Sequence, residues 1–272
     1  MTIHGWNAIS DKMMGLYAQS CIECAIDDER FENFKQDSGY TTILEGAPKL
    51  FFDYYLQAVK SHENYKTFLD NIDKFRINDT LGNPDIYVDL EVGEFSPTTL
   101  KFAFNAIDII SFIDKFGDRS KLKNIVEIGG GYGGLCLILS GFFEFDQYTL
   151  VDLPETCKLI DKYISNFPHL NGKVKTLPCD ELHKFEDEEI DLTIAINSLS
   201  ECDLDTQLIY FDKFVSKSNF GYIVRNPDNY ERMEEHKKTI STLPDNFLVD
   251  DSNKVEEWYS SNIIVYIKKE KN

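Results

Sequence analysis

The sequence lacks the features of a membrane or secreted protein. Its longest apolar stretch, residues 135–143, is interrupted by Ser140 and Gly141, whereas a membrane-spanning helix needs about 18 apolar residues in a row. The N-terminal segment MTIHGWNAISDKMMG has no basic stretch followed by an apolar one, so we expect no signal peptide. These absences favour a soluble, cytoplasmic protein that does not insert into a membrane.

Positive charge is scarce as well. Lysine and arginine number 28 against 47 aspartates and glutamates, which gives a formal net charge of −19. Such an acidic surface repels nucleic acids and anionic membranes unless a local basic patch intervenes. The densest lysine cluster is at the C-terminal end. We therefore expect a small molecule, and not a nucleic acid, as the partner of this chain.

Cysteine is present, but not in a pattern that binds metal. Six cysteines are scattered over 272 residues, a chain long enough to bury a core without disulfides. Cys21 and Cys24 form the sole CxxC motif, without the second pair that a zinc site requires. No HExxH motif occurs. We expect both cysteines to be small core or flanking residues of a helix, and we expect no metal cofactor.

Hydrophobic spacing divides the chain into two parts. Residues 1–120 show helical periodicity, and Ser96-Pro97 opens a helix that Gly117 ends. Residues 121–272 alternate strand-like runs with helix-length segments, which indicates an α/β fold with a parallel, doubly wound sheet. We expect seven strands, at 124–129, 148–153, 173–178, 191–197, 221–226, 246–251 and 262–268, the last two forming an antiparallel hairpin at the sheet edge. The expected helices of this second part include 133–142, 155–166 and 205–217.

The strongest local signal is the run VEIGGGYGG at 126–134. Glycines between a strand and a helix let a ligand approach the backbone, and a helix N-terminus offers free N–H donors. The glycines also satisfy GxGxxG, and Asp152 follows 21 residues after Gly131 (152 − 131), where an acid binds ribose hydroxyls. The motif alone therefore permits either a nicotinamide cofactor or S-adenosylmethionine.

Two features favour S-adenosylmethionine. Glu127 lies two residues before the first glycine, where its carboxylate would repel a pyrophosphate but tolerate a cationic sulfonium. The fourth expected strand ends in the polar run NSLSECD, at the edge where an open α/β sheet binds ligands. The motifs VEIGGGYGG, YTLVDLPET and INSLSECD, taken together, resemble the class I methyltransferases. Within that class they resemble the sugar O-methyltransferase family of bacterial surface-polysaccharide gene clusters.

The resemblance covers residues 121–272 well and residues 1–120 loosely, through FSPTTLKFA. It implies a seven-stranded Rossmann-like core with the last strand antiparallel, and a helical N-terminal region that caps the cofactor cleft and could carry a homodimer interface. It also implies roles for individual residues. The cofactor-binding set would be Glu127, Gly129, Gly131 and Gly133 around the methionyl part, Asp152 on the ribose, Leu153 and Asp180 at the adenine, and Asn197 with Ser198 near the methyl group.

Methyl transfer to a hydroxyl benefits from a general base. We expect Glu201 or Asp203 in this role, although either acid could instead cap the following helix, and we keep His183 as a weaker candidate. Arg225, at the end of the fifth strand, could bind an anionic substrate group such as a nucleotide diphosphate, or form an internal ion pair. Asn197 stands where metal-dependent relatives often have an acid, which argues against a metal.

The sequence therefore predicts an S-adenosylmethionine-dependent O-methyltransferase. Its expected acceptor is a sugar hydroxyl, nucleotide-activated as in a GDP-linked sugar or heptose, in capsular or lipo-oligosaccharide biosynthesis. Three alternatives stay open: methylation of a phosphate or phosphoramidate oxygen on a polysaccharide precursor, an NAD-dependent oxidoreductase, and a methyltransferase-like module without catalysis. The sequence does not identify the acceptor.

Overall fold

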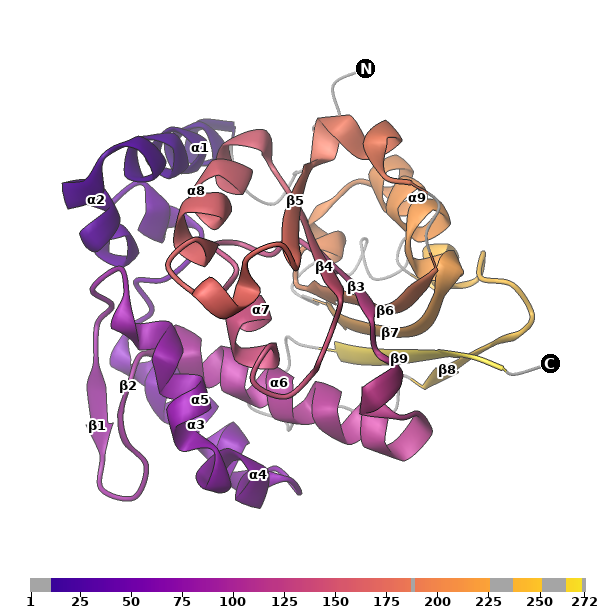
Figure 1. Ribbon diagram of the computed structural model, residues 1–272, viewed down its shortest axis with the longest axis horizontal. Helices are drawn as coiled ribbons and strands as arrows, with labels where there is room; N and C mark the ends of the chain where they lie inside the picture. The colour runs from indigo at the N-terminus through magenta and orange to yellow at the C-terminus, as the bar shows by residue number, and fades with distance from the viewer. Residues whose placement is uncertain (1–10, 187–188, 226–236, 251–262, 271–272) are drawn as a thin grey trace.

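The computed structural model describes residues 11–186, 189–225, 237–250 and 263–270. Its centre is a seven-stranded sheet with the strand order β5-β4-β3-β6-β7-β9-β8 (Figure 1). The strands of this sheet are β3 (Asn124–Ile128), β4 (Gln147–Asp152), β5 (Val174–Pro178), β6 (Ile190–Ile196), β7 (Ser218–Arg225), β8 (Phe247–Asp250) and β9 (Ile263–Lys269). The first five pair in parallel, and β9 pairs antiparallel with both β7 and β8.

This sheet confirms the predicted fold class. Each of the seven expected strands is present, and the last two form the expected antiparallel hairpin at the edge, with β9 on its inner side. The predicted helices correspond to α7 (Gly134–Leu139), α8 (Pro154–Ile164) and α9 (Leu204–Lys213). The connection from β5 to β6 departs from a regular alternation, because its described residues carry only the 3-10 helix η6 (Cys179–Lys184).

The N-terminal part is mainly helical, as expected. It comprises α1 (Asp11–Ile26), α2 (Asp28–Glu32), α3 (Lys49–Ser61), α4 (Tyr65–Asp70), α5 (Ile72–Arg76), α6 (Pro97–Phe116) and a small antiparallel pair, β1 (Tyr87–Asp89) with β2 (Gly93–Phe95). The α6 boundaries match the prediction, because the Ser96 side chain caps the N-terminus by accepting from Thr99 N, and Gly117 follows the last turn. Cys21 and Cys24 are fully buried on α1, as expected.

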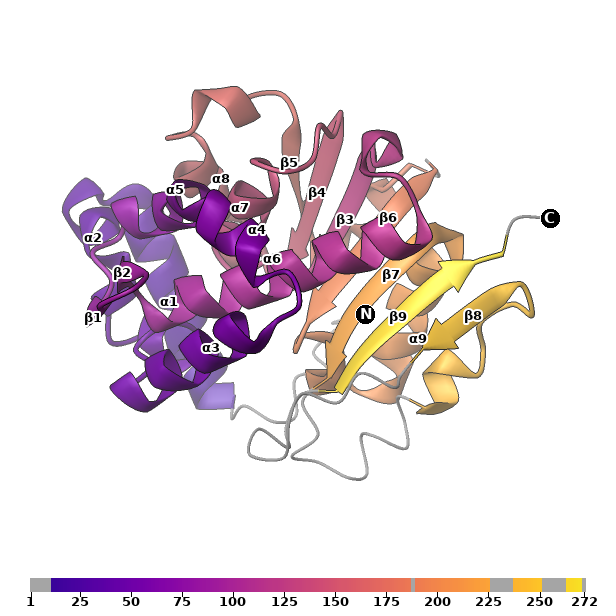
Figure 2. The ribbon, with the colours of Figure 1, turned by 90° about the horizontal axis from the view of Figure 1, so that it is seen from below.

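The helices cover the two faces of the sheet unequally. Buried side chains of α6, α7 and α8 join one face of the sheet to the N-terminal helices in a single large core, whereas α9 covers the other face in a smaller one. Figure 2 shows α6 crossing the first face, beside β3, β6 and β7. The N-terminal region thus packs against the same sheet whose strand ends carry the glycine loop. None of the described helices is long and apolar enough to cross a membrane.

Candidate active site

The glycine loop, the end of β4 and the end of β6 meet in one cavity. Its volume is about 140 Å³, and residues at the carboxyl ends of β3, β4 and β6 form its floor. Ligands bind at this edge of open α/β sheets, because loops diverge there. The floor residues that the sequence had singled out are Gly129, Gly131, Asp152, Leu153, Asn197, Ser198 and Glu201. The structure therefore brings most of the predicted site together.

The glycines of the loop are required by both conformation and space. Gly129, Gly131 and Gly133 have φ angles of 75°, 60° and 91°, in the left-handed region that L side chains rarely adopt. A Cβ on Gly129 would lie 2.3 Å from the Cβ of Ser198. Gly131 faces the cavity, whereas Gly133 lies beneath the loop at the start of α7, where a Cβ would contact Ile164.

Asp152 ties the glycine loop to the end of β4. Its Oδ2 accepts from Gly131 N at 2.9 Å and its Oδ1 accepts from Leu153 N at 2.7 Å. Burial raises the pKa of this carboxyl to about 6, although the two backbone hydrogen bonds oppose the rise. Because the carboxylate also lines the cavity, it fixes the loop and presents an acceptor to a ligand at the same time.

Glu127 is the acid placed before the first glycine, and it does not line the cavity. Its side chain is on the face of β3 toward α7, with Oε2 accepting from Tyr148 OH at 2.7 Å, and only 4% of the residue is exposed. Burial raises its pKa to about 8, against the hydrogen bond from Tyr148. At neutral pH this group is mostly an uncharged acid, and its hydrogen bond with Tyr148 joins β3 to β4 just before the glycine loop.

A smaller cavity continues from the first beneath Leu153. Its lining combines shared residues, Gly129, Asp152, Leu153 and Ser198, with apolar or weakly polar side chains such as Cys179 and Tyr210. This composition suits a flat, apolar ring. Asp180, expected at the adenine, is exposed on η6 next to Cys179 and lines neither cavity.

The polar run after β6 separates the three candidate bases. Glu201 ends the 3-10 helix η7 (Leu199–Glu201) and lines the cavity. Asp203 is instead the N-cap of α9, where its side chain accepts from Thr206 N at 2.8 Å. His183 is exposed on η6, outside the cavity. Of the three, the structure brings only Glu201 to the floor of the site.

Asn197 and Ser198 shape the cavity beside Glu201. Asn197 has a φ of 63°, unusual for a residue other than glycine, and its N–H donates to Val224 O. Such strain at a strand end is typical of functional sites. Ser198 is buried and donates from Oγ to Ile128 O at 2.5 Å, which holds the end of β6 against the start of the glycine loop.

The N-terminal region supplies the roof of the cavity, and sequence reasoning named none of these residues. Met14 and Tyr17 come from α1, Ile43 and Leu44 follow the 3-10 helix η2 (Tyr40–Thr42), and Lys101 comes from α6. A Cβ on Gly131 would lie 2.7 Å from Leu44 Cδ1, so the roof contacts the glycine loop directly. The signal that could have found Lys101 is a lone basic residue in the otherwise apolar start of α6.

Tyr132, in the middle of the glycine run, anchors the loop to the N-terminal region. Its hydroxyl accepts from Asn78 Nδ2 at 2.8 Å, and its ring lies 4.6 Å from the Nζ of Lys35. Lys35 is 2% exposed and donates to Asn78 O. A buried ammonium requires such partners, because isolated burial of charge is costly. The N-terminal region and the glycine loop therefore pack together as one unit.

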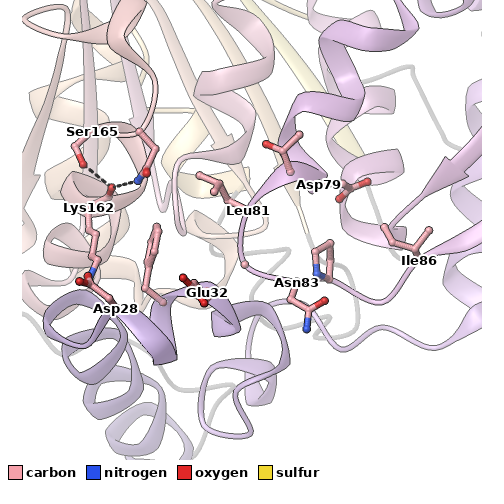
Figure 3. Close-up of a pocket in the computed structure, with 13 residues that line it drawn as sticks. Asp28, Glu32, Asp79, Leu81, Asn83, Ile86, Lys162 and Ser165 are labelled. Carbon is pink, nitrogen blue, oxygen red and sulfur yellow. Dashed lines mark hydrogen bonds and ion pairs between the residues drawn. The ribbon is translucent and has the colours of Figure 1, made fainter.

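A larger surface groove, about 720 Å³, lies elsewhere in the structure (Figure 3). It lies between α2, the segment 79–86 and the end of α8, and Asp28 closes one side through an ion pair with Lys162. The groove lies at one end of α8, whereas Asp152 lies just before the other end. Because α8 has 11 residues, it is about 16 Å long, and the groove is far from the glycine loop. We therefore place the chemistry in the 140 Å³ cavity, where the strand ends converge.

Two expectations remain, one about Arg225 and one about a metal site. Arg225 is 2% exposed at the end of β7 and lines neither cavity of the strand ends. Among the residues that the structure describes, no group of three or more His, Cys, Asp or Glu side chains is arranged to hold a metal ion.

Comparisons with known proteins give no family assignment. No protein-family model and no curated protein matches the chain. Among solved structures, an S-adenosylmethionine-dependent methyltransferase from Clostridium acetobutylicum ATCC 824 is similar at 13% identity and a TM-score of 0.48, covering 61% of this chain and 91% of its own. The magnesium protoporphyrin IX methyltransferase of Synechocystis PCC 6803, solved with S-adenosylmethionine, is similar at 10% identity and a TM-score of 0.47, covering 75% and 94%.

An O-methyltransferase is also among the similar structures. Mitomycin 7-O-methyltransferase has 13% identity and a TM-score of 0.44, and the match covers 80% of this chain and 67% of that one. Likenesses at this level carry no information on what this chain binds. Cofactor and substrate therefore have to be argued from its own residues.

Proposed function

We propose that this protein is an S-adenosylmethionine-dependent O-methyltransferase. The observation that carries the proposal is the cavity itself, which joins the left-handed glycines, the Asp152 carboxylate and the polar end of β6 in one place. A Cβ at Gly129 would clash with Ser198 and one at Gly131 with Leu44, so only glycine lets the loop lie this close to the end of β6 and to the roof. The adjoining cavity, lined by Leu153 and Tyr210, measures about 10 Å³, and we propose that it widens to take the adenine ring when the cofactor binds.

These residues fit the cofactor in kind. Asp152 would accept hydrogen bonds from the ribose hydroxyls, Leu153 would pack on the adenine, and the 129–133 loop with Asn197 and Ser198 would surround the methionyl part. A pocket for a ligand of this size usually measures about 300–1,000 Å³, more than the 140 Å³ seen here. We therefore propose that Leu44 and its neighbours in the roof move outward when the cofactor binds.

The bound cofactor supplies an activated methyl group on a sulfonium centre. The chain's own contribution is alignment, because holding two reactants in line removes much of the barrier to a bimolecular step. We propose that the roof, once it has moved to admit the cofactor, still covers the reacting atoms and excludes water from them. Glu201 lines the cavity, and we propose that it lies against the acceptor oxygen. Asp203 and His183, the other two candidates, stay outside the cavity.

For the acceptor we propose a sugar hydroxyl, with a nucleotide-activated sugar such as a GDP-linked heptose as the first compound to test. The support is the resemblance of the three sequence motifs to sugar O-methyltransferases of capsule and lipo-oligosaccharide clusters. We do not assign the diphosphate of such a substrate to Arg225, because this residue is buried and lines neither cavity. A phosphate or phosphoramidate oxygen on a polysaccharide precursor is the alternative acceptor.

The test is transfer of a tritiated methyl group from S-adenosylmethionine to a panel of GDP-, UDP- and CDP-linked sugars and to phosphorylated precursors. We expect label in a sugar product that resists acid and base as an ether does. Label in a product whose methyl protons couple to phosphorus in the NMR spectrum would instead indicate a phosphate oxygen. Label in nitrogen, or none with any acceptor despite cofactor binding, would contradict an O-methyltransferase of this class.

A further inference from the structure

The cavity contains one cation that the proposed function does not use. Lys101 lies in the first turns of α6, between Leu100 and Phe102, which are both buried. Its side chain lines the same cavity as Gly129, Asp152 and Glu201. α6 belongs to the N-terminal region, so this lysine reaches the strand ends from the roof, on the side opposite the glycine loop.

The surroundings of Lys101 are mixed in charge. Burial lowers the pKa of its ammonium, while the charges of Glu201 and Glu45 partly restore it. The other titratable groups of the cavity are Asp152, from β4, and Tyr17, from α1, whose pKa burial raises well above its usual value. Burial therefore favours the amine form of Lys101, and the two carboxylates favour its ammonium form.

We propose that Lys101 is the catalytic base that removes the proton of the acceptor hydroxyl, with Glu201 as a positioning residue beside it. This inference rests on the proposed methyl transfer. A free amine is a far stronger base toward a hydroxyl than a carboxylate, and general-base catalysis is most effective when the base has a pKa near the working pH. Glu201, as the neighbouring anion, then orients the nitrogen and stabilises the ammonium that forms.

The step balances in atoms and charge. The O–H bond of the acceptor breaks, and its proton goes to the lone pair of Lys101 Nζ. The acceptor oxygen forms a bond to the methyl carbon, whose bond to sulfur breaks with the electron pair going to sulfur. One positive charge thereby moves from sulfur to Lys101. A sulfonium in the cavity disfavours the ammonium by repulsion before transfer, and a neutral thioether no longer does so afterwards.

This charge relation gives a test that needs no acceptor. Binding of S-adenosylmethionine, which carries the sulfonium, should release more protons at pH 8 than binding of S-adenosylhomocysteine, which lacks it. Calorimetric titrations of the full chain in phosphate and in Tris give the number of protons released from the buffer dependence of the heat. Lys101→Met should abolish the difference between the two ligands. Lys115→Met, on the same helix but on the surface, should keep it.

Each outcome is informative. Failure of both ligands to bind the unmodified chain would contradict the proposed function. Binding of both with equal proton release would overturn the role of Lys101 alone, as would an unchanged difference in Lys101→Met. Retained affinity of Lys101→Met for S-adenosylhomocysteine is expected and shows that the variant is folded.

A second experiment distinguishes a Lys101 that accepts a proton from a Lys101 that only supplies positive charge. Lys101→Arg keeps the positive charge but holds its proton at every usable pH. Methyl transfer by this variant, assayed with the acceptor that the tritium experiment labels, should fall by about 10²–10⁴-fold. Near-normal turnover in Lys101→Arg would overturn the proposal. Glu201→Gln should instead shift the ascending, acidic limb of the kcat–pH profile to lower pH, because the anion that favours the ammonium form of Lys101 is removed.

Discussion

The buried acid beneath the glycine loop gives a quantitative prediction. Glu127 is 4% exposed, and burial raises its pKa from 4.5 to about 8. A carboxyl with a raised pKa in the folded state keeps its proton there while the unfolded chain loses it, so stability falls as pH rises from 4.5 to 8. Each pH unit in that window corresponds to about 1.4 kcal/mol. Between pH 5.5 and 7.5 the group should therefore remove about 2–3 kcal/mol from the free energy of unfolding.

The substitution Glu127→Gln isolates this effect, because the amide oxygen can still accept from Tyr148 while the titration is gone. The variant should gain about 2–3 kcal/mol relative to the unmodified chain between pH 5.5 and 7.5, measured by urea denaturation with the slopes compared at each pH. Glu144→Gln, at an exposed position, controls for the loss of one negative charge. A difference between Glu127→Gln and the unmodified chain that stays constant with pH would refute the burial argument.

Three further variants test other parts of the site. Gly129→Ala should abolish binding of S-adenosylhomocysteine, whereas Gly172→Ala, with a similar φ of 76° and nothing within 4 Å of the added Cβ, should cost about 1–2 kcal/mol of stability and keep binding in calorimetry. Asp203→Ala should lower the free energy of unfolding by about 1 kcal/mol through its lost helix cap without reducing methyl transfer. Glu201→Gln should reduce the maximal rate of transfer about 100-fold, because the acceptor and Lys101 lose the group that positions them; equal effects of the two variants on transfer would contradict this division. Leu44→Ala should speed association of S-adenosylhomocysteine in stopped-flow mixing, and an unchanged rate would show that this side chain does not obstruct entry.

The fold could be predicted because its signals are local. Alternating apolar runs marked the strands, and the cap and stop signals at Ser96 and Gly117 fixed α6 to the residue. The edge hairpin followed from the missing helix before the last strand. The prediction was weakest between β5 and β6. A regular alternation of strands and helices would place an α-helix there, but the link is short and its described residues form the 3-10 helix η6.

The floor of the site was predictable for the same reason, whereas its roof was not. Gly129, Asp152 and Glu201 each follow a strand, so the parallel sheet brings them together. Lys101 and Leu44 reach the cavity through the packing of the N-terminal helices, which no local pattern encodes. The side-chain direction of Glu127 was missed too: strand alternation points it toward Tyr148 and away from the cavity.

The most direct test of the account is a thermal and calorimetric titration of the full chain with S-adenosylhomocysteine and, separately, with NAD. We predict that S-adenosylhomocysteine binds and, at 100 times its dissociation constant, adds about 2.7 kcal/mol of stability. Asp152→Ala should abolish this gain, while Asp146→Ala, at an exposed position before β4, should retain it. Stabilisation by NAD alone would contradict the account and indicate a dehydrogenase, and stabilisation by neither ligand would indicate a module that binds no such cofactor.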